Sequence, residues 1–173
     1  GAGQDTTSRL IAMAVLVLGE RPDLQDRLRA EPNRIADFIE EVLRFDGPVK
    51  VAYRLATVDT RVGDFEIPAG TIATVCLNAA SNDPGRFAHP GNFDIDRPGL
   101  RDHMGFSKGP HGCLGAPLGR MESRIAVEHL LARVRNIRIS EKHHGPAGAR
   151  AYNFEPTYTF RSLADLYIEF DPA

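Results

Sequence analysis

The sequence predicts a mainly α-helical fold with small β-sheets. Apolar residues recur at helical spacing before residue 46 and again after residue 113. Between residues 49 and 77 the pattern changes to short runs rich in β-branched and aromatic residues. The chain has 173 residues, of which 42% are hydrophobic and 25% are charged, so these segments can share one hydrophobic core.

Three helices are expected first. Residues 6–18 are apolar on nearly every side in their second half, which is typical of a helix that is buried all round. Pro22 suits the first turn of a short helix over residues 22–31. Asn33 can cap a third helix over residues 34–45, whose apolar residues recur every three or four positions.

Short strands and a long irregular stretch follow. The strands are expected over residues 49–57, 61–68 and 71–77, separated by turns that contain glycine and proline. Residues 82–112 are rich in Pro, Gly, Asn and Asp, and their spaced phenylalanines indicate that this stretch packs against the rest of the protein. A last helix over residues 114–134 and a terminal hairpin over residues 155–170 complete the prediction.

Composition excludes several classes of protein. The formal net charge of −2 gives no broad basic field, so neither nucleic acid nor an anionic membrane is an expected partner. The longest apolar run, Leu10 to Leu18, is far shorter than the roughly 20 residues of a membrane-spanning helix. The two cysteines, Cys76 and Cys113, form no disulfide framework. The sequence therefore predicts a soluble, cytoplasmic protein.

Cys113 lies in an unusually glycine-rich stretch, GFSKGPHGCLG, over residues 105–115. A lone cysteine is often a buried apolar residue. Here the glycines allow the backbone to approach a flat partner closely, and the helix that begins just after the cysteine favours a thiolate. Ligands for a structural zinc site are too few. His111 could serve as the base of a nucleophilic cysteine, which leaves a cysteine hydrolase as an alternative.

This stretch resembles the haem-binding loop of the cytochrome P-450 family. The family motif is Phe-x-x-Gly-x-x-x-Cys-x-Gly, and Phe106, Gly109, Cys113 and Gly115 stand at the matching positions. Ser107 stands where the family usually has glycine. The resemblance implies the family's fold, in its C-terminal portion, and implies haem b as the cofactor, with the Cys113 thiolate as the axial ligand of the iron.

Further haem contacts are implied by the same resemblance. His111 and Arg54 match family residues that bind the haem propionates, and a guanidinium suits a carboxylate. The residues expected to contact the cofactor are Ala2, Gly3, Arg54, Phe106, His111, Cys113, Leu114 and Gly115.

A charge network is also implied. Glu41 and Arg44 stand three residues apart on the expected third helix, a spacing that alone indicates an ordinary surface ion pair. The two residues match the family's Glu-x-x-Arg pair. Residues 83–98 resemble the family's meander region, in which Arg97 matches the arginine that completes the network. Such a network would brace the long loop behind the haem.

The opening residues, GAGQDTT, resemble the oxygen-binding groove of the family's long helix, Ala-Gly-x-Asp-Thr. Gly3 would leave room over the iron, and the Thr6 hydroxyl can bond to the carbonyl of Ala2. Asp5 and Thr6 match the acid and alcohol that deliver protons to bound dioxygen, through water. The residues expected to line the substrate pocket are Val49, Val51, Ala52, Thr159 and Phe160.

The resemblance implies a bacterial haem-thiolate monooxygenase that oxidises an apolar small molecule. Electrons would come from a ferredoxin and its reductase, or a similar flavoprotein, docking near Lys108, Arg120 and Arg124. A peroxide-driven peroxygenase is a second hypothesis, against which Asp5 and Thr6 count.

A third hypothesis is a truncated, non-catalytic haem-binding fragment, because family members are considerably longer than this chain. On this reading residues 1–173 are the C-terminal haem-binding portion of a single domain. The N-terminal portion, which the resemblance implies is absent, would then be a partner.

Overall fold

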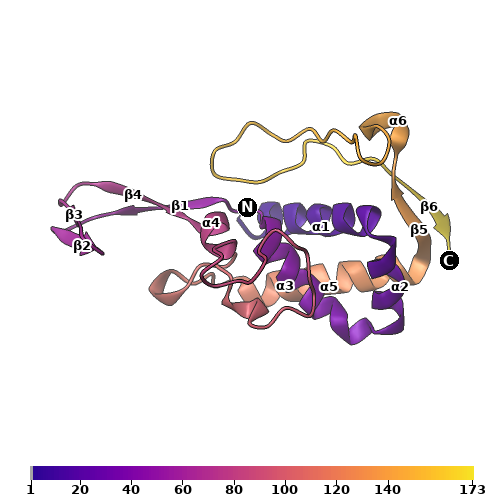
Figure 1. Ribbon diagram of the computed structural model, residues 1–173, viewed down its shortest axis with the longest axis horizontal. Coiled ribbons are helices and arrows are strands. Elements are labelled where there is room, and N and C mark those ends of the chain that lie inside the picture. The colour runs from indigo at the N-terminus through magenta and orange to yellow at the C-terminus, as the bar shows by residue number, and fades with distance from the viewer. Residues whose placement is uncertain (1) are drawn as a thin grey trace.

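Three long helices form the body of the molecule in the computed structural model, which describes residues 2–173 except for the side chain of Ala2. Helix α1 (Ala2–Glu20) packs against α3 (Ile35–Asp46) and α5 (Ala116–Arg133), and the shorter α2 (Pro22–Ala30) closes one end of the group (Figure 1). The helices predicted before residue 46 are therefore confirmed. Asn33, however, does not cap α3, because it lies in a 3₁₀ turn, Pro32–Arg34, that runs directly into the helix.

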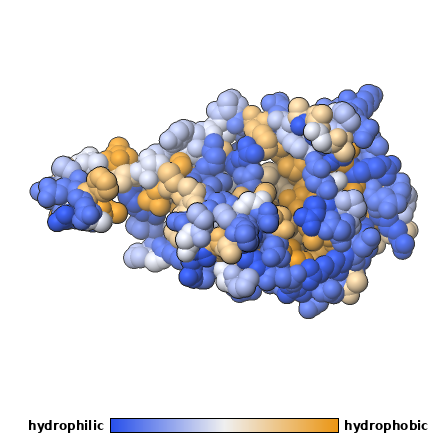
Figure 2. Space-filling view, in the orientation of Figure 1, coloured by the Kyte–Doolittle hydropathy of each residue, from blue (hydrophilic) through white to orange (hydrophobic). Residues whose placement is uncertain are grey.

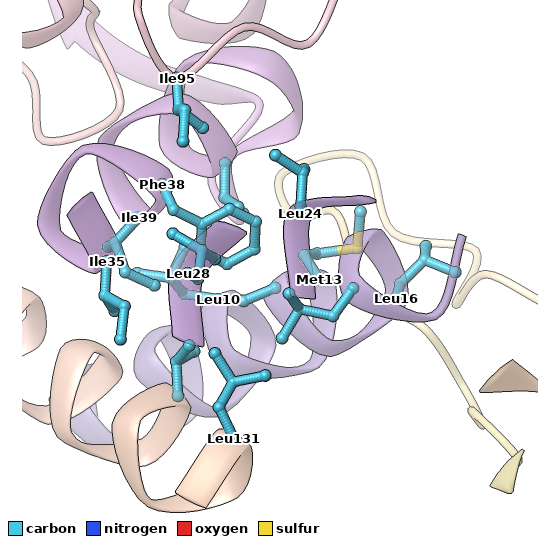
Figure 3. Packing of buried hydrophobic residues seen from close by; sticks show 14 of the residues in the cluster. Leu10, Met13, Leu16, Leu24, Leu28, Ile35, Phe38, Ile39, Ile95 and Leu131 are labelled. Carbon is cyan, nitrogen blue, oxygen red and sulfur yellow. The ribbon is translucent and has the colours of Figure 1, made fainter. Parts of the chain in front are cut away.

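The hydrophobic core lies where these helices meet. Leu10 and Met13 of α1, Phe38 of α3 and Leu131 of α5 are at most 5% exposed and point toward one another, with Ile95 covering the cluster from the irregular stretch (Figure 3). Residues 10–18 of α1 are all buried or half-buried, as expected for a helix that packs against neighbours on several sides.

A narrow β-arm projects from the helical body (Figure 1). Strand β1 (Val51–Leu55) pairs antiparallel with β4 (Ile72–Cys76), and the hairpin of β2 (Thr60–Val62) and β3 (Phe65–Ile67) forms its tip. Gly63 has a φ of 59° in the turn of this hairpin, a conformation that favours glycine. The strands predicted over residues 49–57 and 71–77 are confirmed as β1 and β4, whereas residues 61–68 form the turn and parts of both strands of the tip hairpin.

The irregular stretch packs against the helices. It follows the short α4 (Leu77–Ser81) and includes two 3₁₀ turns, Leu100–Asp102 and Gly109–His111. Phe87 is 2% exposed, and Phe93 and Phe106 contact the core, so the predicted packing of this stretch is confirmed. No helix within residues 2–173 has the length and apolar character needed to cross a membrane.

The C-terminal region differs from the prediction. Strand β6 (Ile168–Pro172) pairs with β5 (Val134–Ile139), and α6 (Glu141–His144) follows β5. The expected hairpin over residues 155–170 is confirmed in part. The N–H of Glu155 donates to the carbonyl oxygen of Ser162 at 2.9 Å, so the chain does turn back on itself here, but residues 168–170 belong to β6. Between α6 and β6 the chain forms a long loop beside α1 (Figure 1), held by isolated bridges from Val49 to Phe160 and from Phe154 to Leu163. Ile137 and Ile139 of β5 are buried in the hydrophobic core.

Candidate functional site

A cavity of about 360 Å³ lies between α1, the base of the β-arm and residues 105–115, which we call the cysteine loop. It brings together residues from distant parts of the sequence. Those predicted from sequence that line it are Thr6, Val49, Ala52, Arg54, Phe106, His111 and Cys113. The cavity also has leucines from α1, α3 and α4 in its wall, so its interior is largely apolar with polar groups in a few places.

The cysteine loop turns back on itself to present Cys113. The backbone N–H of Cys113 donates to the carbonyl oxygen of Phe106 at 2.9 Å, and the N–H of Ser107 donates to that of Met104 at 2.7 Å. Gly109 has a φ of 67° and Ser107 a φ of 57°. Both values lie in the left-handed region, which glycine adopts freely and which a residue with a side chain, such as Ser107, rarely adopts.

Cys113 is accessible and lies just before a helix. Its side chain is exposed, and helix α5 begins three residues later, at Ala116. Within residues 2–173 no group of three or more His, Cys, Asp or Glu side chains could hold a metal ion.

The donors around this cavity fit a haem. Cys113 supplies a sulfur ligand, the apolar wall suits a porphyrin ring, and Arg54 and His111 supply groups that can bind carboxylates. Arg54 is half-buried on β1, where it donates to the carbonyl oxygen of Tyr53 at 2.8 Å. His111 is exposed at the end of a 3₁₀ turn. These residues come from three elements that converge on one cavity.

Other predicted residues lie outside the lining of this cavity. Gly3 and Gly115 line a neighbouring hollow between α1 and α5. Val51 is buried, Leu114 is 99% exposed, and the side chain of Ala2 lies outside the described part of the chain. Thr159 and Phe160 lie beside the segment that leads into β1. The carbonyl oxygen of Thr159 accepts a hydrogen bond from the backbone N–H of Lys50 at 2.8 Å, and Phe160 forms an antiparallel β-bridge with Val49.

The acid on α1 is part of an ion-pair chain. Arg9 contacts Asp5 at 3.0 Å, one turn away on the same helix, and Glu155 at 2.8 Å, in the C-terminal loop. Hydrogen bonds to these two carboxylates raise the pKa of Arg9 above its ordinary value. The Arg9 guanidinium also lies 5.0 Å from the centre of the Phe160 ring. Asp5 is thereby connected to the segment that was expected to line the substrate pocket.

Glu41, Arg44 and Arg97 form one buried ion-pair network. Arg44 donates to both oxygens of Glu41, through Nε at 2.7 Å and Nη2 at 2.9 Å. Arg97 reaches the same carboxylate at 3.4 Å, and the backbone N–H of Asp94 donates to it at 2.9 Å. Glu41 and Arg44 are both 0% exposed. The network therefore ties α3 to the irregular stretch that leads into the cysteine loop.

A larger hollow of about 660 Å³ lies away from Cys113, between α1, α3 and residues 152–161. Apolar residues are visible in the middle of the helical body (Figure 2). Burial raises the pKa of Asp46 at its wall, although the ion pair with Arg161, 2.8 Å away, opposes the shift. This hollow contains none of the residues predicted from sequence to act in catalysis.

The family model for cytochrome P450 matches residues 1–142. The chain belongs to the cytochrome P450 family. It is 50% identical to the solved structure of cytochrome P450 CYP150A6 of Mycobacterium marinum in its substrate-free form, with a TM-score of 0.97 over 99% of this chain and 42% of that one. The family resemblance and the fold class that were predicted from sequence are thus confirmed.

Curated relatives give the same picture. Cytochrome P450 144 of Mycobacterium tuberculosis is 41% identical over 76% of this chain. The biotin biosynthesis cytochrome P450 of Bacillus subtilis is 33% identical over 98% of it. This chain spans 30% and 41% of their respective lengths. It therefore corresponds to less than half of each of these cytochrome P450 relatives.

Several residues of the site were missed from sequence. Thr7 and Leu10 line the cavity with Thr6, and their spacing on one helix could have indicated a shared face. Leu43 and Leu77 also line it, but as leucines in buried segments they carry no distinguishing signal. Such residues show that the cavity of this cytochrome P450 chain depends on packing as much as on its motifs.

Proposed function

We propose that this chain forms the haem-binding part of a haem-thiolate monooxygenase that oxidises an apolar small molecule. One observation carries the proposal. Thr6 of α1 and Cys113 of the cysteine loop, which are far apart in the sequence, line the same apolar cavity. The family resemblance of both segments supports the same assignment. When bound there, haem supplies an iron centre that activates dioxygen with two electrons.

Different residues of the chain would bind the haem, transfer protons and exclude water. The Cys113 thiolate would hold the iron, and Arg54 and His111 would bind the propionates. Asp5 would accept and release protons at its carboxylate, with Thr6 positioning water between the acid and the cavity. The apolar side chains of Val49 and Ala52 would exclude bulk water from the substrate.

The test is the absorption spectrum of the haem-loaded, reduced protein with carbon monoxide. We expect the band of a thiolate-ligated iron, lost in Cys113→Ser. Cys76→Ser is the matched control, because Cys76 is the other exposed cysteine and lies in β4. A protein that binds no haem, or a spectrum unchanged by Cys113→Ser, would contradict the proposal.

The electron donor would be a ferredoxin with its reductase, or a similar flavoprotein, docking beside the cysteine loop. Three cations were expected to form a basic patch there. Each faces a carboxylate: Lys108 lies 3.7 Å from Asp102, Arg120 2.5 Å from Glu40, and Arg124 2.5 Å from Glu128. We therefore expect the reduction rate to depend only weakly on salt, and a steep dependence would restore the basic patch.

A second candidate is a fragment that binds haem without catalysis until the rest of the fold covers it. Helix α5 and the residue before its cap present exposed apolar side chains, which are Leu114, Leu118, Met121 and Ile125. An exposed apolar row of this kind marks a contact surface. The portion of the fold that the relatives have in addition would be the partner. Turnover by this chain alone would exclude the candidate, and turnover with peroxide but not with reductant and dioxygen would favour a peroxygenase.

A further inference from the structure

Two consecutive glutamates of α3 are buried but face different neighbours. Glu41 joins the network with Arg44 and Arg97, whereas Glu40, which is 2% exposed, contacts His103 and Arg120. Successive residues of an α-helix point about 100° apart, so one helix can hold two separate parts of the chain. Glu40 is directed toward the cysteine loop.

The contact between Glu40 and His103 has a defined direction. Nδ1 of His103 accepts the backbone N–H of Gly105 at 3.0 Å, so the ring proton lies on Nε2. Nε2 is 2.8 Å from Oε2 of Glu40 and donates to it. The imidazole ring therefore joins the carboxylate of α3 to the first residue of the cysteine loop.

Arg120 of α5 reaches the same carboxylate and also contacts the loop. Its Nε donates to Oε1 of Glu40 at 2.5 Å and its Nη2 to Oε2 at 3.1 Å. Burial would raise the pKa of Glu40, but hydrogen bonds from His103 and Arg120 lower it to about 2. The carboxylate is thus ionised and holds both partners by charge-assisted hydrogen bonds.

Phe106 connects this cluster to the thiol. The guanidinium of Arg120 lies over the Phe106 ring, 4.5 Å from its centre. The carbonyl oxygen of Phe106 accepts the backbone N–H of Cys113 at 2.9 Å. Glu40 therefore holds the guanidinium of Arg120, which packs on the ring of Phe106. The backbone of Phe106 in turn holds the backbone of Cys113.

We propose that Glu40, acting through His103 and Arg120, is the positioning residue for the Cys113 thiol. The proposal rests on the proposed function only in taking this thiol as the iron ligand. It gives Arg120 an internal role in place of the docking role expected from sequence. The cluster also explains why a buried carboxylate stands next to Glu41, which already serves the other network.

Amide hydrogen exchange in the full chain without haem provides the first test. In Glu40→Gln and in Arg120→Gln, we expect the Cys113 amide to exchange about tenfold faster, relative to the Leu131 amide in the core of α5. Glu128→Gln is the matched control, because it removes a carboxylate from an exposed pair with Arg124, and it should change neither amide. An unchanged Cys113 amide, or an equal acceleration of both amides, would overturn the proposal.

The second test uses the haem-loaded protein. Glu40→Gln should lower the fraction of the reduced carbon monoxide complex that keeps thiolate ligation, whereas Glu128→Gln should not. If Glu40→Gln does not fold, Arg120→Lys decides, because it keeps the charge but loses the planar contact with Phe106. We then expect a several-fold faster Cys113 amide, and no change would refute the positioning role. A wild-type spectrum without thiolate ligation would defeat only the proposed function, since the exchange result needs no haem.

Discussion

Removing the guanidinium of Arg44 should lower the free energy of unfolding of the protein substantially. Arg44→Met keeps the aliphatic stem but removes a charge that is 0% exposed. The guanidinium donates twice to Glu41 and also to Asn82 Oδ1 at 3.0 Å and to the carbonyl oxygen of Asn92 at 3.2 Å. All of these bonds are lost in the variant.

The size of the effect follows from what remains. Breaking a buried ion pair by removing one partner costs about 3–5 kcal/mol, because the other charge stays buried. Glu41 keeps Arg97 at 3.4 Å and the N–H of Asp94 at 2.9 Å. We therefore expect the lower end of this range, about 3 kcal/mol. In the double variant with Glu41→Gln the buried carboxylate is gone as well, so the two changes should cost about 2 kcal/mol less than their sum.

Equilibrium unfolding in urea measures both quantities, provided that the slope against urea is unchanged. Arg124→Met is the control, since it breaks an exposed pair with Glu128 and should change the free energy of unfolding by less than about 0.5 kcal/mol. If Arg44→Met costs no more than this control, or if the double variant shows additive costs, the reasoning about the buried network is refuted.

Three further predictions concern other residues. The pKa of Glu40 in the folded protein, about 2, is below its ordinary value of 4.5, so its stabilising effect is complete above pH 4.5 and disappears as the pH falls toward 2. Between pH 4.5 and pH 2 the free energy of unfolding should therefore fall by about 3 kcal/mol less in Glu40→Gln than in the wild type. An unchanged dependence on pH would contradict this. Ser107→Gly should raise the free energy of unfolding by about 0.5–1 kcal/mol by relieving the left-handed backbone, and a lower value in urea would argue against strain there. Leu118→Ser should leave stability within about 0.5 kcal/mol but reduce self-association in sedimentation, because Leu118 is 52% exposed, and equal association would exclude the α5 face.

Much of the fold was predictable because periodicity is a local signal. The apolar spacing in residues 34–45 and the β-rich patterns in residues 49–57 and 71–77 identify their own elements. The C-terminal pairing was not predictable in this way. Val134 continues the helical pattern of α5 but begins β5, and the partner of β5 begins only at Ile168. Pairing over such a distance is decided by tertiary packing, which local patterns do not contain.

The candidate site likewise has parts that were predictable from sequence and parts that were not. The cysteine loop and the Glu-x-x-Arg pair are readable because their residues are close in sequence. The contact of Glu40 with His103 joins residues 63 positions apart, and a charged residue on a helix is ordinarily assigned to its solvent face. Arg120 was expected at the docking surface for an electron donor, and only the packing of α3 against α5 shows its partner Glu40.

Helix α3 has no solvent face near its charged residues. Residues 38–44 are all buried, because the apolar side chains meet the core while the charged side chains meet the irregular stretch and helix α5. Mutational tolerance along most helices rises and falls with a period of 3.6 residues. Across these residues it should stay uniformly low, so that sequence drift in this part of the chain is confined to the helices and loops around it.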